Sequence, residues 1–362
     1  MRNIMSFSKK NGLIFVPFMT GMGGTERVIQ NLFEEINNRD LSIELKVESI
    51  GGSDNYDWSQ NVPINVTFIS KRRIFRTLFY LFCLPFFIFK KVKNNDVDFI
   101  ISTNPIMWSL SKVSVRLLRR NTKIIAWYHY SLKQKPINKK LLNSADYYLA
   151  ISSGIERQLI GLGVDSDKVS LIYNPVNTSN TVIPRPTRET KFLYIGRLDL
   201  DGQKNIRELL SALGQLKGDW KLDTYGDDSN RQEITDFAKQ VGVEDQIKWH
   251  GFKEDVWSEI NETTALVMTS KYEGLPMVLC EAISHGIYCI SSDVETGPED
   301  IINQNNGKLY AQGKVEELTS ILQSIIDGAD LPNSSVIIKT AEKFNSIEYL
   351  KRFENAVLKS LD

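Results

Sequence analysis

The chain has 362 residues, 42% of them apolar and 24% charged, which is the composition of a globular protein with room for two domains of ~150 residues. Its net charge of zero hides an asymmetry, because residues 1–175 carry 24 Lys and Arg against 14 Asp and Glu, while residues 176–362 carry 20 against 30. Cys83, Cys280 and Cys289 lack the spacing of a disulfide framework or a zinc site, so a disulfide-stabilised secreted domain is excluded and a reducing compartment is indicated.

The charge asymmetry suggests that the two halves meet different partners, with random drift between domains as the alternative. The first ten residues are polar and lack the apolar core of a signal peptide. We therefore expect a cytoplasmic protein.

Short apolar runs alternate with helical stretches through the first half of the chain. Such near-continuous runs are typical of strands buried in a parallel sheet. They occur at residues 12–18, 97–102, 123–128, 147–152 and 169–173, with a predicted helix at 25–37. A polar stretch at 174–190, with three prolines, is the best candidate for a linker.

The pattern restarts after this stretch. Strands are predicted at 191–196, 221–226, 247–251, 265–269 and 288–292, with a helix at 206–216. Two successive arrays of this kind predict an α/β protein with two doubly wound domains facing across a cleft. We assign residues 1–175 to the first domain and 176–346 to the second. The last helix, in residues 347–362, could pack on either domain, including back on the first.

Cations enclose an apolar segment within residues 71–93. The twelve apolar residues at 78–89 are too few to span a bilayer, which needs about 20. Aromatic residues flanked by Lys and Arg suit the interface of an anionic membrane, so we expect that partner. The predicted contacts are Arg72, Arg73, Arg76, Lys90, Lys91 and Lys93. The alternative is a core helix of the first domain, kinked at Pro85.

Two features of the first domain could contact a ligand. The string GMGG at 21–24 follows the first predicted strand and opens a helix, where backbone N–H groups can approach a phosphate or a sugar. A plain tight turn explains it equally well. His129 ends the strand at 123–128, and its alternative is a packed, hydrogen-bonded histidine among aromatic neighbours.

Charged pairs follow two strands of the second domain. Arg197 and Lys204 come after the strand at 191–196. A guanidinium clamps two oxygens and an ammonium acts as a point charge, so the pair suits a departing diphosphate. Glu273 and Glu281 stand eight residues apart, across the end of one strand and the following helix. Two acceptor-only groups at that spacing suit a polyol with hydroxyls at both ends, such as a sugar joined to a ribose.

The loop from Gly196 to Lys204 and the Glu273–Glu281 pair, in this strand context, resemble the retaining glycosyltransferases of the GT-B fold, family GT4. The resemblance is scattered over residues 12–30 and 97–176 and nearly continuous over 192–310. The loop between Arg197 and Lys204 is longer than is usual in the family. This longer version is similar to the branch that contains lipopolysaccharide galactosyltransferases.

The resemblance implies two Rossmann-like domains and a role for each matching position. Arg197 and Lys204 would bind the diphosphate, Glu281 the ribose hydroxyls and Glu273 the donor hexose. His129 would face the donor sugar. The remaining donor contacts would be Gly23, Gly24, Phe252, which is placed to stack on the base, and the backbone of Gly274, Leu275, Pro276 and Met277.

The chemistry implied is transfer of a hexose, with retention, from a nucleotide diphosphate sugar, expected to be UDP-linked, to a hydroxyl of a cell-surface glycan or lipid-linked acceptor. A UDP-sugar epimerase and a non-catalytic sugar-binding partner of an active enzyme are the alternatives. We expect no nucleic acid partner. The enzyme would be cytoplasmic, with a peripheral position on the inner face of the plasma membrane if residues 71–93 meet lipid.

Two Asp-x-Asp strings could mimic a metal site, at Asp96 and Asp98 and at Asp199 and Asp201. The first leads into a buried strand and the second lies in the cationic loop. Because Arg197 and Lys204 can do the electrostatic work of a metal, we expect neither a metal nor another cofactor.

Overall fold

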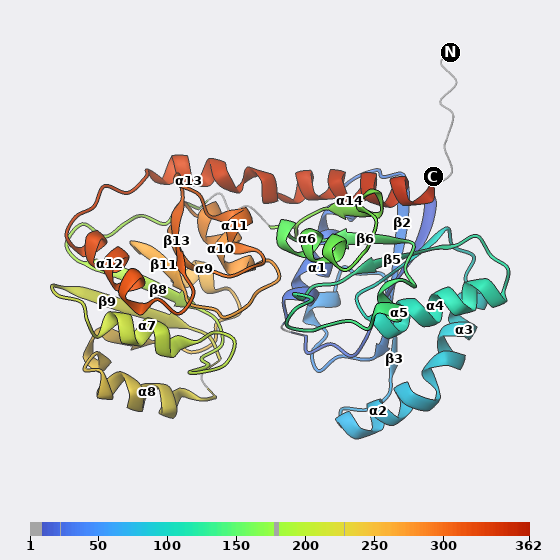
Figure 1. Ribbon diagram of the computed structural model, residues 1–362, viewed down its shortest axis with the longest axis horizontal. Helices are drawn as coiled ribbons and strands as arrows, with labels where there is room; N and C mark the ends of the chain where they lie inside the picture. Colours follow the sequence, from blue (N-terminus) through green and yellow to red (C-terminus); the bar gives the residue numbers. More distant parts are fainter. Residues whose placement is uncertain (1–8, 22, 177–180, 228) are drawn as a thin grey trace, which may run out of the picture. The chain divides into compact units, whose positions relative to one another are not determined.

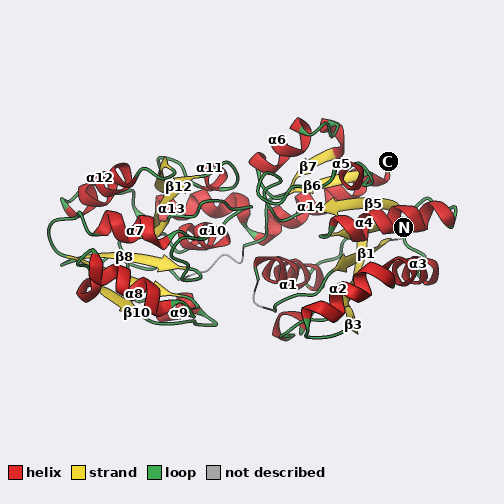
Figure 2. Ribbon diagram, turned by 60° about the horizontal axis from the view of Figure 1, so that its bottom comes forward, coloured by secondary structure: helices red, strands yellow, loops and turns green. Residues whose placement is uncertain are grey.

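The computed structural model describes residues 9–21, 23–176, 181–227 and 229–362 (Figure 1). The chain divides into two compact units. Unit 1 comprises the residues up to Pro175 together with Ser346–Asp362, and unit 2 comprises Val176–Asn345. Each has a parallel sheet with helices packed around it, as the colouring of Figure 2 shows. The prediction of two doubly wound α/β domains is confirmed.

Unit 1 has a seven-stranded parallel sheet in the order β3-β2-β1-β4-β5-β6-β7. Its strands are β1 (Lys10–Val16), β2 (Ile43–Gly51), β3 (Ile64–Phe68), β4 (Phe99–Ser102), β5 (Lys123–Trp127), β6 (Tyr147–Ala150) and β7 (Val169–Leu171). Its helices are α1 (Gly24–Asn37), α2 (Arg73–Phe82), α3 (Leu84–Asn94), α4 (Pro105–Leu117), α5 (Lys139–Leu142), α6 (Ser153–Gly161) and α14 (Ser346–Leu361). All four residues of β4 are buried, because layers on both faces of the sheet exclude water.

Unit 2 has a six-stranded parallel sheet in the order β10-β9-β8-β11-β12-β13. Its strands are β8 (Thr190–Ile195), β9 (Trp220–Tyr225), β10 (Ile247–Trp249), β11 (Ala265–Met268), β12 (Tyr288–Asp293) and β13 (Gly307–Ala311). Its helices are α7 (Ile206–Leu213), α8 (Arg231–Gln240), α9 (Val256–Glu259), α10 (Met277–Ser284), α11 (Pro298–Ile301), α12 (Val315–Ile326) and α13 (Ser334–Ala341). The strand order reverses between β8 and β11, so the loops that follow these two strands meet at the edge where such sheets bind ligands.

The C-terminal helix α14 completes the core of unit 1. It packs on α1 and β5, and the ring of Phe353 lies 5.9 Å from that of Trp127. Tyr349, Phe353 and Val357 are buried, spaced four residues apart on one face of the helix. The chain therefore returns to unit 1 after crossing unit 2.

The apolar segment at 71–93 forms two helices with different surroundings. Helix α3 buries Leu84, Ile88 and Val92 and packs against α4, as the core alternative requires. Helix α2 has no buried residue. The break falls at Cys83, with Pro85 in the first turn of α3. No helix in the described part of the chain is long and apolar enough to cross a membrane.

Candidate active site

The loops after β8 and β11 form one polar surface in unit 2. The side-chain amide of Gln203 donates to the Tyr272 carbonyl at 3.0 Å, and the Lys271 N–H donates to the Gln203 carbonyl at 2.8 Å. Tertiary structure thus joins two segments about 70 residues apart in sequence. The predicted residues Arg197, Lys204 and Glu273 all lie on these two loops.

Lys204 and Glu273 form an ion pair at the centre of this surface. Their Nζ and Oε1 atoms are 2.7 Å apart, and their side chains are only 18% and 10% exposed. At such partial burial a charge-assisted hydrogen bond is stronger than at the surface. The Arg197 side chain is exposed and donates to the Gln203 amide oxygen at 3.1 Å. Its guanidinium is therefore accessible to an anion beside the pair.

Asn205 fixes the backbone that carries Lys204. It adopts a left-handed conformation with φ of 50° and precedes α7. Asparagine tolerates this conformation better than most residues because its short side chain bonds locally, and here its amide donates to Glu208 at 2.5 Å. The Thr269 hydroxyl donates to the carbonyls of both Lys204 and Asn205 at 3.1 Å.

Glycines let the strand ends approach closely. A Cβ on Gly226 would lie 1.8 Å from the Gly196 carbonyl oxygen, and one on Gly297, where φ is +99°, would lie 2.9 Å from the Gly274 carbonyl oxygen. A side chain at either position would force the neighbouring backbone to shift. Glycine is therefore required at the ends of β8 and β9, and at residue 297 where it packs against the loop at residue 274.

The segment from the end of the β11 loop into α10 begins with two buried residues and carries the carboxylate of Glu281 further along. Leu275 and Pro276 are buried, so their side chains are not exposed on this surface, and their main-chain contact with the donor stays a prediction. Glu281 lies on the second turn of α10 and is half-buried, and its Oε2 accepts a hydrogen bond from the indole N–H of Trp257 at 2.9 Å. Sequence reasoning did not identify Trp257, since a tryptophan in a four-residue helix carries no pattern.

The other predicted positions of unit 2 lie after β10 and along α10. Phe252 is 57% exposed, which leaves its ring free to stack on a base. His250 pairs with Asp223 at 2.6 Å and stacks flat on Tyr225 at 4.3 Å. His285 is buried at the end of α10. Both histidines have structural surroundings.

In unit 1 the glycine loop is held by a carboxylate that sequence reasoning missed. Gly23 is the N-cap of α1, and Gly24 begins the helix with open space around it. Glu26, on the first turn, is 5% exposed, and its Oε1 accepts from the backbone N–H groups of Thr20 and Gly21 at 2.8 and 3.0 Å and from the Thr20 hydroxyl at 3.1 Å. The sequence did carry a signal for this role, because Glu26 is an acidic residue in the first turn of a predicted helix, right after the glycine loop.

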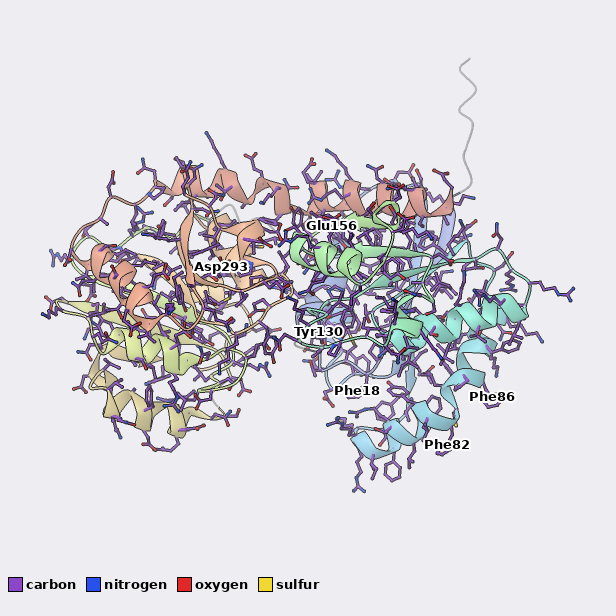
Figure 3. The ribbon with its side chains drawn as sticks, viewed as in Figure 1. Phe18, Phe82, Phe86, Tyr130, Glu156 and Asp293 are labelled. Atoms are coloured by element: carbon purple, nitrogen blue, oxygen red, sulfur yellow. The ribbon has the colours of Figure 1, made fainter. Side chains whose placement is uncertain are left out.

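His129 is half-buried at the end of β5, 4.7 Å from the Trp127 ring. Its Nε2 atom is buried and has no hydrogen-bond partner among the described residues. Burial lowers the pKa of His129 to about 3, so the imidazole is neutral at pH 7 and can bond a hydroxyl without carrying charge. Tyr130, labelled in Figure 3, is partly exposed and its ring is covered by Lys135.

Neither Asp-x-Asp string forms a cluster of ligands. Asp98 accepts from the Asn11 N–H at 2.9 Å, and Asp201 forms a two-point ion pair with Arg207 at 2.6 and 2.7 Å. Within the described ranges, no three His, Cys, Asp or Glu side chains are placed to hold one metal ion.

Comparisons with known proteins place the two units in related families. Residues 177–344 match the family "Glycosyl transferases group 1" and residues 22–180 match "Glycosyltransferase Family 4". The chain is 31% identical over 353 residues to lipopolysaccharide 1,6-galactosyltransferase of Salmonella typhimurium, a match that covers 95% of this chain and 97% of the relative. The enzyme of the same name from Escherichia coli K12 is 30% identical over 351 residues. That match covers 95% of this chain and 96% of the relative.

The solved structures agree. The apo form of the lipopolysaccharide outer core galactosyltransferase WaaB superposes with a TM-score of 0.85 at 30% identity, over 96% of this chain and 99% of that one. Anabaena Alr3699/HepE, solved with UDP and glucose, gives a TM-score of 0.77 at 17% identity, again over 96% and 99% of the two chains. The second likeness bears on the fold alone.

Proposed function

The chain is a glycosyltransferase of the GT-B fold and belongs to family 4, and we propose that it transfers galactose from a UDP-linked donor, with retention, to a hydroxyl of a lipopolysaccharide-type glycan. The Lys204–Glu273 ion pair beside the exposed Arg197 carries this proposal. It combines two cations for a diphosphate with a carboxylate for a sugar on one surface. The names of the 30%-identical relatives support galactose and the acceptor class.

In this mechanism Arg197 and Lys204 neutralise the charge that develops on the departing diphosphate. Glu273, already fixed by Lys204, orients the hexose and stabilises positive charge on its ring. Glu281 holds the ribose hydroxyls, and the backbone around residues 274–277 contacts phosphate and sugar. No described residue needs to form a covalent bond, because a front-face route lets a diphosphate oxygen take the proton of the attacking hydroxyl.

We propose that no metal takes part, since two cations stand where the diphosphate would bind. Turnover in EDTA at the rate measured without it supports the proposal. Loss of turnover in EDTA with recovery on adding Mn²⁺ overturns it.

We place the acceptor against unit 1 because of its charge. Residues 71–140 contain sixteen Lys and Arg but only two acidic residues, Asp96 and Asp98. Such a field attracts an anionic glycan or lipid. The neutral His129 and the Glu26-held glycine loop offer hydrogen-bonding groups for the uncharged hydroxyls of the donor sugar, the role that the family resemblance implies for them.

We also propose that α2 docks on an anionic membrane that presents a lipid-linked acceptor. In Figure 1 this helix (light blue) extends from the body of unit 1, and Phe82 and Phe86 are labelled in Figure 3. Phe86, in the first turn of α3, is 79% exposed, and the apolar side chains of α2 that are exposed too are Ile74, Phe75, Leu78, Leu81 and Phe82. Exposed apolar side chains on one short segment flanked by cations suit the headgroup boundary of a membrane.

The six cations predicted to contact lipid fall into two groups, those paired within unit 1 and those with exposed side chains. Lys91 pairs with the buried Glu48 at 2.6 Å, and Arg76 donates to the Ser70 carbonyl at 2.8 Å while its guanidinium lies 3.5 Å from the Phe18 ring centroid. These two stabilise the domain. The cations with exposed side chains are Arg72, Arg73, Lys90 and Lys93, joined by Lys71.

Two experiments test these proposals. A panel of nucleotide sugars, assayed for release of nucleoside diphosphate, should give turnover with UDP-galactose, and no turnover with any UDP-sugar refutes the donor assignment. In flotation with anionic vesicles the wild type should bind. The double variant Phe82→Ser/Phe86→Ser should lose binding, while Ile347→Ser, an exposed apolar residue on α14, should keep it. Equal flotation of all three proteins rejects the membrane surface.

A further inference from the structure

Helix α9 places an indole against the candidate ribose-binding carboxylate. This helix has only four residues, Val256–Glu259, and lies between β10 and β11. The Nε1–H of Trp257 donates to Glu281 Oε2 at 2.9 Å. A carboxylate on a flexible side chain has several rotamers, and a hydrogen bond from a rigid, half-buried indole selects one of them.

A second contact holds the indole itself. The Trp257 and His285 rings stack, with centroids 4.7 Å apart and planes 25° apart. His285 is 6% exposed, and its Nδ1–H donates to the Thr181 carbonyl at 2.8 Å, which fixes the ring and its tautomer. Burial lowers the pKa of His285, so the ring is neutral at pH 7. His285 therefore holds the Trp257 ring in place, and Trp257 in turn holds the Glu281 carboxylate.

We infer that Trp257 is a positioning residue of the donor site, acting through Glu281 on the ribose. The inference rests on the proposed function, because it takes Glu281 as the ribose ligand. A carboxylate has about four acceptor positions, so Oε2 can accept the indole N–H and a ribose hydroxyl together. The indole therefore need not leave when a nucleotide binds, and its N–H keeps the carboxylate in the orientation that the ribose requires.

The test measures recognition of the ribose hydroxyls separately from overall binding. Dissociation constants of UDP and of 2′,3′-dideoxy-UDP are measured by calorimetry for the wild type, Trp257→Phe, Glu281→Gln and Trp249→Phe. Trp257→Phe keeps an aromatic ring to stack on His285 and removes the pyrrole ring that carries the N–H. Trp249, at the end of β10, is the matched control in the same unit.

We expect the wild type to prefer UDP over the dideoxy analogue by about tenfold, the order of one charge-assisted hydrogen bond. Trp257→Phe and Glu281→Gln should each reduce that preference to threefold or less, and Trp249→Phe should leave it unchanged. With UDP-galactose, Trp257→Phe should raise KM while kcat stays within a factor of about two. A merely structural role for Trp257 would change stability but not the preference for the ribose hydroxyls.

Other outcomes overturn the inference. An unchanged preference in Trp257→Phe shows that the indole does not act on the ribose, and tighter UDP binding by that variant shows that it competes with the nucleotide. A wild type that binds UDP without preferring the hydroxyls removes the role of Glu281, and with it that of Trp257. A wild type that binds no UDP refutes the proposed donor itself, which is a distinct result.

Discussion

The candidate sites of the two units differ in where their charged side chains lie. Unit 2 concentrates ionised groups on its binding surface, with the Lys204–Glu273 pair and the exposed Arg197. Unit 1 has a carboxylate turned inward to hold a loop at Glu26 and a histidine kept neutral by burial at His129. A diphosphate needs cations, whereas sugar hydroxyls need hydrogen bonds without a net field. The difference matches a donor on unit 2 and uncharged hydroxyls at unit 1.

The cations of unit 1 are concentrated in residues 71–140, a stretch that includes α2 to α5 and also His129. Long-range charge can gather an anionic acceptor without placing a cation at the reacting hydroxyl. The following predictions test this division, from the largest expected effect to the smallest.

Lys204→Ala should have the largest effect. It removes a diphosphate cation and leaves Glu273, whose side chain is 10% exposed, without its partner. We expect kcat/KM to fall by about a thousandfold, as when one electrostatic group of a transition state is lost. The measurement is the initial rate of UDP release. Lys191→Ala, at a partly buried lysine paired with Glu262 in the same unit, is the control and should lose less than about tenfold.

Gly226→Ala should destabilise unit 2 alone. The new Cβ would meet the Gly196 carbonyl oxygen at 1.8 Å, so two strands would have to separate. We expect the free energy of unfolding of unit 2 to fall by about 3 kcal/mol or more, in the range of severe backbone clashes. Hydrogen exchange of each unit reports this. Gly161→Ala in α6, with nothing near its Cβ, should be neutral or slightly stabilising.

Glu273→Ala and Glu281→Ala should differ in which kinetic constant they change. Glu273 is assigned to the hexose and Glu281 to the ribose, so the first should lower kcat by about a hundredfold and the second should raise the donor KM by about tenfold. Steady-state kinetics with UDP-galactose separates the two constants. Equal changes in both constants for both variants mean that the carboxylates act as one binding unit.

Glu26→Gln should weaken transfer without weakening UDP binding. The amide loses the charge that strengthens three hydrogen bonds to the glycine loop. We expect kcat/KM to fall by about tenfold while the Kd of UDP, whose site we propose on unit 2, stays constant. Glu35→Gln on the same helix, where the carboxylate pairs with Arg39, is the matched control. A changed Kd for UDP contradicts the separation of the two units' roles.

The last prediction, whose effect near neutral pH is small, is a pH dependence of stability from His129. Its folded pKa of about 3 lies below the ordinary 6.5, so the unfolded chain binds more protons between these values and stability falls as pH decreases through that window. His129 should contribute a loss of up to about 1.4 kcal/mol for each pH unit below 6.5. Urea unfolding at pH 5.0 and 7.0 measures it. His129→Phe should show a shallower slope, while His285 titrates in both proteins.

Sequence reasoning predicted the short, fully buried strands and also the edge strands β7 and β10, but it missed β2, β3 and β13. β4, β5 and β11 are short, fully buried apolar runs. β2 alternates buried and exposed residues at its start, and β3 is an edge strand with no buried residue, so neither gives a continuous apolar signal. The family resemblance is confirmed by the matching family models. Its motifs lie in the loops that follow buried strands, so the sequence spacing from strand to motif was enough to identify them.

The sequence by itself determined the two-domain α/β class, the family and the identity of the charged residues, because strand periodicity and short loop motifs are local properties. Only the tertiary structure decided which groups meet. It joined Lys204 to Glu273, turned Glu26 toward its own loop and set Trp257 against Glu281. It also divided residues 71–93 into a packed helix and an exposed one, since burial depends on what the rest of the chain places opposite each face.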